Sequence, residues 1–150
     1  MSERRPQTGP LPLRGRVQSG KGDAARWLAA FNDAYVRKTG MPVFPGSLNV
    51  ALDIPFDWSA RNLRDRIILF LGEEFGGERD ILMLPCKLPS LGSQRAFLWT
   101  TTNTVTESAR RPIVEIIASV GLRDVYGLQD GDLVEVEILP AAGSTESLVD

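Results

Sequence analysis

Residues 13–23 read LRGRVQSGKGD, and they set the architecture that we expect for the chain. In residues 13–17 two apolar residues enclose two arginines, a pattern that predicts a first strand. Residues 19–23 contain two glycines and end in Asp23. This residue suits a helix N-cap, because its carboxylate can accept hydrogen bonds from the free amides of a first helical turn. The segment therefore predicts a strand, a turn and a helix in immediate succession.

One amphipathic helix is predicted after this turn, over residues 24–38. Trp27, Phe31 and Tyr35 recur every four residues and form a single apolar stripe. Gly40 suits the position just beyond the helix end. No similar pattern recurs between the later strands, which argues against repeated βαβ units.

Further short strands are expected along the rest of the chain, with a short helical turn at 122–127 and a tight turn at Asp130-Gly131-Asp132. This pattern predicts a mainly β fold, a small barrel with one helix inserted after the first strand. We expect this domain to span residues 13–139, between flexible tails at 1–12 and 140–150. The further strands are predicted at 50–52, 67–71, 81–86, 95–100, 113–118 and 133–139.

The composition is that of an ordinary globular domain, with 150 residues, 43% hydrophobic residues and a net charge of −2. No basic field is present to capture nucleic acid or anionic lipid. The absence of histidine, together with a single cysteine, Cys86, argues against zinc sites and excludes a Ser–His or Cys–His nucleophile pair. Arg4 and Arg5 are not followed by the apolar stretch of a signal peptide, and the longest apolar run, Ile67 to Leu71, is too short to span a bilayer. We expect a cytoplasmic protein that binds neither membrane nor nucleic acid.

The glycine turn is the first candidate binding segment. Glycines allow close approach of the backbone to phosphates, and free amides at a helix start favour an anion. Lys21 adds a charge. However, the spacing is not that of a Walker A motif, and on spacing alone a plain turn is the favoured alternative.

Further polar side chains lie where they could bind a metal ion or a substrate. Ser47 and Asn49 are two residues apart, so in an extended chain their side chains share a face. A hydroxyl and an amide carbonyl are neutral oxygen ligands that suit Mg²⁺, although the same residues are also common in turns, where they bond to nearby backbone. Glu115 lies among apolar strand residues and faces either solvent or a pocket. Near the predicted helical turn, Arg123 could meet a phosphate or remain solvated.

Taken in order, these segments resemble the archaeal-type CTP-dependent riboflavin kinases. That family carries G-x-V-x-S-G-x-G-E-G, then G-T-L-N, then E-I-I-A-P-x-x-L-R, then L-x-D-G-D. The resemblance extends from about Leu13 to Leu139 and is weak between Asp53 and Ser93. The matching segments here are Gly15 to Gly22, Pro45 to Asn49, Glu115 to Ala118, Leu122-Arg123 and Leu128 to Asp132.

The resemblance implies a cradle-loop β-barrel that transfers the terminal phosphate of CTP to riboflavin, with Mg²⁺, and gives FMN and CDP. It implies that Ser47 and Asn49 bind the Mg²⁺ and that Thr101 and Glu115 contact the flavin. Glu115 is also a candidate acceptor for the proton of the reacting hydroxyl. The nucleotide contacts that the resemblance implies are Gly20, Lys21, Gly22, Asp23, Ala24, Ala25, Val120, Gly121, Leu122 and Arg123.

The chain departs from the family pattern at both substrate sites. Asp23-Ala24 replaces Glu-Gly, and the lost glycine restricts approach of the backbone to phosphates. Ser47 replaces Thr and keeps the hydroxyl, Ser119 replaces Pro, and Thr101-Thr102-Asn103 stands where the family has T-x-H. A non-catalytic nucleotide- or flavin-binding homologue is therefore an alternative. A DNA-binding cradle-loop regulator is another, which the net charge and the scattered arginines disfavour.

Overall fold

The computed structural model describes residues 9–20, 32–71, 80–101 and 110–141, and the structural statements that follow concern these residues. They form seven strands, one α-helix of two turns, one short α-helix and one 3₁₀ turn. The elements are β1 (Leu11–Gln18), α2 (Asn32–Thr39), β2 (Leu48–Asp57), η1 (Arg61–Leu63), β3 (Ile68–Phe70), β4 (Ile81–Leu88), β5 (Gln94–Thr101), β6 (Arg110–Ile117), α5 (Leu122–Tyr126) and β7 (Leu133–Ile138).

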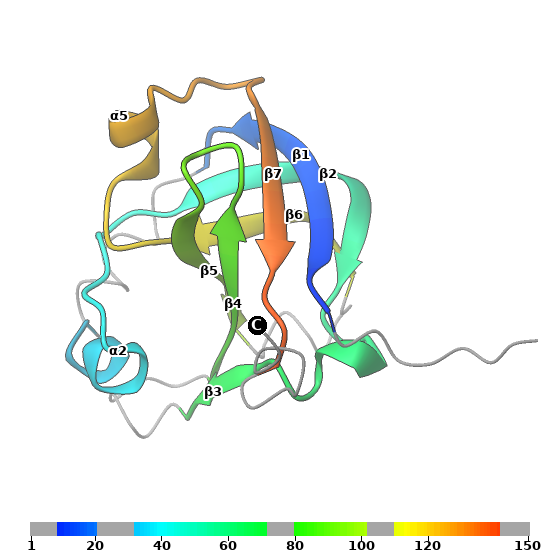
Figure 1. Cartoon of the computed structure of the whole chain (residues 1–150), viewed down its shortest axis with the longest axis vertical. Helices are drawn as coiled ribbons and strands as arrows, with labels where there is room; N and C mark the ends of the chain where they lie inside the picture. Colours follow the sequence, from blue (N-terminus) through cyan, green and yellow to red (C-terminus); the bar gives the residue numbers. More distant parts are fainter. Residues whose placement is uncertain (1–8, 21–31, 72–79, 102–109, 142–150) are drawn as a thin grey trace, which may run out of the picture.

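Six of these strands close into an antiparallel barrel in the order β4-β5-β6-β2-β1-β7 (Figure 1). The ring closes where Cys86 of β4 lies opposite Ile138 of β7. Strand β3 pairs with the first part of β4 and is an addition to the ring. The predicted mainly β barrel, with a helix after the first strand, is therefore confirmed. Every strand except β2 ends within three residues of its predicted limits, and β1 begins at Leu11, inside the segment predicted as a tail.

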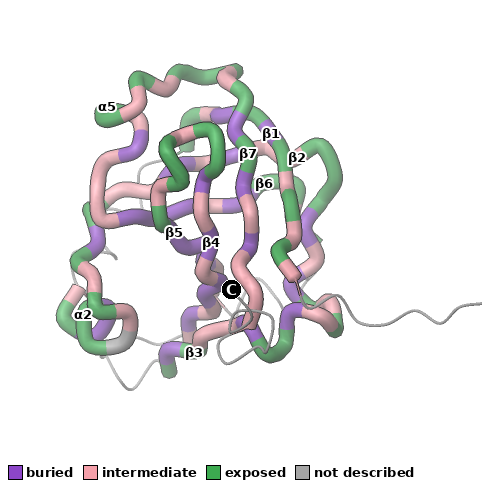
Figure 2. Tube along the Cα trace, in the orientation of Figure 1, coloured by how far each residue is buried: buried purple, intermediate pink, exposed green. Residues whose placement is uncertain are grey.

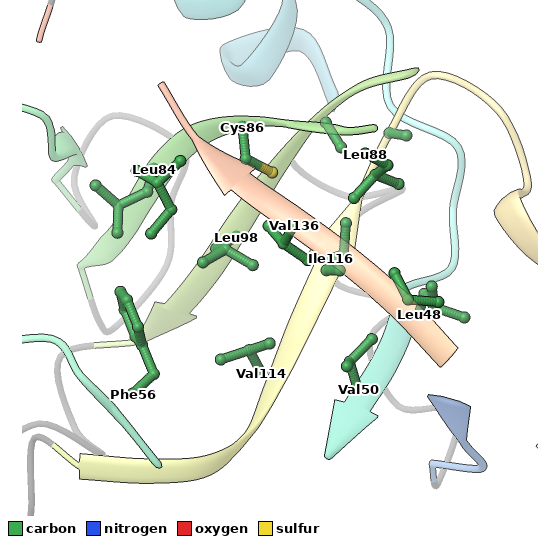
Figure 3. Close-up of a cluster of buried hydrophobic side chains, with 14 of the residues drawn as sticks. Leu48, Val50, Phe56, Leu84, Cys86, Leu88, Leu98, Val114, Ile116 and Val136 are labelled. Atoms are coloured by element: carbon green, nitrogen blue, oxygen red, sulfur yellow. The ribbon is translucent and has the colours of Figure 1, made fainter. Parts of the chain in front are cut away.

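The barrel interior is filled by alternate residues of its strands (Figure 3). Where β2 and β6 pair, Leu48, Val50, Val114 and Ile116 are buried in the interior, and the residues between them, Asn49 and Glu115, are only partly buried. Cys86 belongs to this core, and burial raises the pKa of its thiol to about 12. It therefore acts as a small apolar side chain rather than a reactive thiol.

A second apolar cluster lies on the outside of the barrel, where α2 covers the sheet. Tyr35 of α2 is fully buried there, as its place in the predicted stripe requires. Gly40 ends the helix with a φ of +78°, a conformation that favours glycine. Trp27, Phe31 and the rest of the predicted helix before Asn32 lie outside the described residues. The strand residues of the cluster are Phe70, Ile81, Met83, Phe97, Trp99 and Ile117. No helix in the described part of the chain is long and apolar enough to cross a membrane.

Buried positions recur along the strands, whereas α5 is mostly exposed or half-buried (Figure 2). One charged side chain is buried among them. Arg66, which is 4% exposed, donates to the carbonyls of Asn62 (3.1 Å), Gly9 (2.8 Å) and Leu139 (3.2 Å). It therefore ties the turn after η1 to both the start of β1 and the end of β7.

Replacing Arg66 with Ala removes the donor for these carbonyls and leaves a cavity. We expect the free energy of unfolding to fall by about 2–4 kcal/mol, measured by urea unfolding. Arg64, which is exposed two residues earlier, is the matched control. Its replacement by Ala is expected to change the free energy of unfolding by less than about 0.5 kcal/mol. Equal losses in the two variants would contradict this role of Arg66.

Candidate functional site

The predicted site residues of the strands meet where the end of β1, the start of β2 and the end of β6 lie side by side. Gln18 is opposite Asn49 in the β1–β2 pair, and Asn49 is opposite Glu115 in the β2–β6 pair. Directly opposite residues of antiparallel strands project to the same face of the sheet. Because their neighbours fill the barrel interior, Asn49 and Glu115 face its outer surface. Trp99 lies opposite Glu115 in the β5–β6 pair and extends this row to β5.

Ser47 and Glu115 are joined by a hydrogen bond. The Ser47 hydroxyl donates to Oε1 of Glu115 over 3.0 Å. Burial raises the pKa of Glu115, and the bond from Ser47 partly opposes this. Glu115 is half-buried, so its side chain is partly shielded from solvent rather than fully exposed. With its proton committed to Glu115, the Ser47 oxygen keeps its lone pairs for another ligand.

Asn49 lies against the start of the glycine turn. A Cβ atom placed on Gly20 would overlap the side-chain amide of Asn49, so a larger residue at this position would displace that amide. The Oδ1 atom of Asn49 is buried and has no hydrogen-bond partner among the described residues. A buried acceptor without a partner costs about 1–3 kcal/mol. Such an oxygen, next to a hydroxyl and a carboxylate, fits a hard divalent cation.

The segment before and within α5 adjoins the same place. A pocket of about 180 Å³ brings Ser47 together with Gly121, Leu122 and Arg123. Val120 is half-buried directly before this segment. The structure therefore brings the α5 residues predicted to bind a nucleotide beside a residue predicted to bind a metal. The complete lining is Phe44, Gly46, Ser47, Leu48, Gly121, Leu122, Arg123 and Asp124.

Asp130 connects two of the predicted segments. Its carboxylate accepts a hydrogen bond from the Ser19 hydroxyl over 2.8 Å and from Arg123 Nη2 over 2.7 Å. These bonds, the one from Arg123 above all, lower the pKa of Asp130. The sequence indicated only a turn here, and the turn is confirmed by a φ of +94° at Gly131. Its additional role as a link between the glycine turn and α5 was not predicted.

One predicted site residue lies at the edge of this group, and several others fall outside the described residues. Thr101 is at the end of β5, opposite Ile81, and stands two residues along the strand from Trp99. Lys21, Gly22, Asp23, Ala24 and Ala25 lie outside the described residues, as do Thr102 and Asn103.

Sequence reasoning also missed two aromatic residues beside the site. Trp99 is buried next to Glu115, and its indole N–H has no acceptor among the described residues. Phe44 lines the pocket beside α5. An aromatic residue between Pro42 and Pro45 was a visible signal for Phe44, whereas the position of Trp99 follows only from the strand register.

Comparison with known proteins gives a consistent result. Residues 17–138 match the family model CTP-dep_RFKase, described as "Domain of unknown function DUF120". Proteins named "Riboflavin kinase" from Pyrobaculum arsenaticum and Pyrobaculum aerophilum are 32% and 35% identical over 140 residues, which cover 86% of this chain and 61% of each relative. One from Ignicoccus hospitalis is 30% identical over 132 residues, 85% of this chain and 70% of that protein. The chain thus spans about three fifths of the length of the two Pyrobaculum relatives.

Asp130 provides a test of the link between the turn and α5. Because its pKa is lowered in the folded protein, its stabilising effect is complete above the ordinary pKa of 3.8 and is lost as the pH falls through the lowered value. We expect the wild type to lose more stability than Asp130→Asn between pH 7 and pH 3, measured by urea unfolding. Parallel losses in the two proteins would contradict a link through the charged carboxylate.

Proposed function

The chain belongs to the CTP-dependent riboflavin kinase family, and on this basis we propose that it transfers the terminal phosphate of CTP to riboflavin. The oxygen of the ribityl 5′-hydroxyl forms a bond to the terminal phosphorus of CTP. The bond from that phosphorus to the bridging oxygen breaks, so that FMN and CDP are the products. The proton of the hydroxyl passes to a base of the protein or to solvent.

The observation that carries this proposal is the buried Oδ1 atom of Asn49, which has no hydrogen-bond partner among the described residues. Asn49 itself lies between Gly20 and Glu115. A kinase needs an oxygen ligand of this kind at a point where phosphates approach the backbone. Ser47 and Asn49 are the residues that would hold Mg²⁺. When bound there, the cation would neutralise charge on the phosphate oxygens.

The nucleotide is proposed to contact Gly20, the following residues 21–25, and the segment Val120 to Arg123. Two features of the described residues support this. Gly20 exposes backbone beside Asn49, and Arg123 lines a pocket that also contains Ser47. A guanidinium suits phosphate oxygens because of its fixed charge and paired donors. Its bond to Asp130 holds it in place before a ligand arrives.

Glu115 is proposed to accept the proton of the reacting hydroxyl and to contact the flavin together with Thr101. A carboxylate with a raised pKa is a stronger base than one in water, which suits this role. The bond from Ser47 fixes the orientation of the carboxylate and connects it to the proposed metal site. Phosphoryl transfer depends mainly on such positioning and on neutralisation of charge.

A non-catalytic homologue that binds a nucleotide or flavin is the second candidate. The observation in its favour is that the chain contains no histidine, although the family carries one in its T-x-H element. Incubation with riboflavin, Mg²⁺ and either CTP or ATP distinguishes the two candidates through the appearance of FMN. Flavin binding without FMN from either nucleotide would favour the second candidate.

Replacing Asn49 with Ala tests the metal site. We expect the rate of FMN formation to fall by about 100-fold or more, because the variant lacks one preorganised ligand of the Mg²⁺ that would neutralise charge on the phosphate oxygens. Excess EDTA is expected to stop the wild-type reaction. Asn62→Ala is the matched control, since Asn62 lies within η1 and lines a different pocket from that of the candidate site. A variant at Asn49 that keeps wild-type turnover would contradict the proposed ligand.

Replacing Glu115 with Gln tests the proposed base. An amide keeps an acceptor for the Ser47 hydroxyl but cannot take the substrate proton. We expect kcat to fall by about 100-fold, with little change in KM for CTP and in the melting temperature. A variant with unchanged kcat would show that the proton leaves by another route.

A further inference from the structure

We propose that the pocket between the first half of β1 and the second half of β2 binds an extended segment of another protein, in which apolar side chains alternate with lysine or arginine. This inference goes beyond the proposed function and does not depend on it. The pocket adjoins the start of β1 and η1, whereas the other end of β1 leads to the glycine turn and lies near the loop between α5 and β7 (Figure 1).

Strands β1 and β2 separate at this end of the barrel. They pair only between residues 15–18 and residues 49–52. Their backbones approach closely at Gly15, where an added Cβ atom would overlap the carbonyl of Ala51. Before Gly15, residues 11–14 of β1 still pair with β7, but no strand in the described part of the chain pairs with them on the other side. The start of β1 is therefore a sheet edge.

The facing part of β2 is also without a neighbouring strand. Between the pairs Ala51–Ile113 and Phe56–Arg111, residues 52–55 of β2 stand against Pro112 alone. Among the described strands, residues 53–55 pair with neither β1 nor β6. The pocket lies between this irregular stretch and the open edge of β1, and residues 10–14 and 53–57 contribute much of its lining.

The edge of β1 has backbone groups that an added strand requires. Val17 donates its N–H to the carbonyl of Asp132 over 2.9 Å and accepts from the N–H of Gly131 over 2.8 Å, so its backbone groups point towards β7. Alternate residues of a strand direct these groups to opposite sides. Arg14 therefore directs its N–H and carbonyl into the gap between β1 and β2. An open edge of this kind binds extended peptides through the main chain.

The pocket also offers an apolar surface. Its volume of about 820 Å³ lies within the roughly 300–1,000 Å³ that is typical of ligand sites. Leu13, Phe56 and Leu63 form part of its wall. Ile54, at 78%, is the most exposed large apolar side chain in the described part of the chain, and it lies beside this wall. Apolar surface gathered in this way is typical of an interaction site.

The charges around the pocket indicate a basic partner. Arg14 is the one basic residue of the lining, and its Nε atom lies 3.3 Å from Oδ2 of Asp53. Lys87 approaches Glu137 to 3.9 Å from outside the lining. Carboxylates still predominate, so lysine or arginine next to the apolar residues of a partner is favoured. A second copy of the chain would place the same acidic rim against itself, which disfavours self-association. The acidic residues of the lining are Asp53, Asp57, Glu135 and Glu137.

The test uses three labelled peptides of seven residues, which alternate valine with lysine, valine with glutamate, and serine with lysine. Fluorescence anisotropy measures the Kd of each for the whole chain. We expect the valine–lysine peptide to bind at least about tenfold more tightly than the other two, because only this peptide supplies both the apolar side chains and the opposite charge.

Two variants locate the binding. We expect Ile54→Ala to weaken binding of the valine–lysine peptide by about fivefold or more, and Glu135→Lys to weaken it by about threefold. Leu133→Ala is the apolar control, since Leu133 is 44% exposed and lies outside the pocket. Asp33→Lys is the charge control, since Asp33 is exposed on α2. Both controls are expected to stay within about twofold of the wild type.

Hydrogen exchange tests the addition of a strand. With saturating valine–lysine peptide, we expect exchange of the Arg14 amide to slow by about tenfold or more. Exchange of the Arg16 amide is expected to change little, because Arg16 already has β2 on one side and β7 on the other.

Several outcomes would overturn the inference, whether or not the protein forms FMN. One is the absence of binding by the valine–lysine peptide up to about 1 mM. Equal binding of the serine–lysine peptide would reduce the effect to charge alone, and binding without protection at Arg14 would contradict an added strand. Self-association of the wild type in sedimentation, if Ile54→Ala abolished it, would assign the pocket to a second copy instead.

Discussion

The register in which β2 pairs with both β1 and β6 is the constraint that holds the candidate site together. It sets Asn49 opposite Gln18 on one side and opposite Glu115 on the other. A slip of one residue would turn both side chains into the barrel interior and expose Val50 and Val114, which are buried in the core (Figure 3). The apolar residues of the barrel thus fix the positions of the polar residues between them, and packing of the core positions the site.

The candidate site is energetically less favourable than the apolar core that supports it. The Oδ1 atom of Asn49 is buried without a described partner, and burial raises the pKa of Glu115. Both features cost free energy in the absence of a ligand, and a cation with bound phosphates would relieve both. Arg66 and Asp130 act in the opposite direction. The first ties the turn after η1 to the start of β1 and the end of β7, and the second links the glycine turn to α5.

Strands with clear alternation could be predicted from the sequence, as in β7, whose Val134, Val136 and Ile138 are all buried. The length of β2 could not, because Pro55 and the irregular register between Ala51 and Phe56 interrupt its pattern. The order of the motifs led to Ser47, Asn49 and Glu115. Contacts of Arg66, Trp99 and Asp130 join distant parts of the chain, and no local pattern signals such contacts.

A paramagnetic ion tests most directly whether metal, phosphates and glycine turn meet at one place. NMR spectra of the protein with CDP, recorded with Mg²⁺ and then with Mn²⁺ in its place, would locate the ion through broadening of nearby amide signals. Our account predicts selective broadening at Gly20, Ser47, Asn49 and Leu122. Broadening centred elsewhere, for example around Ile54 and Leu63 near the other end of β2, with these four signals unchanged, would contradict it.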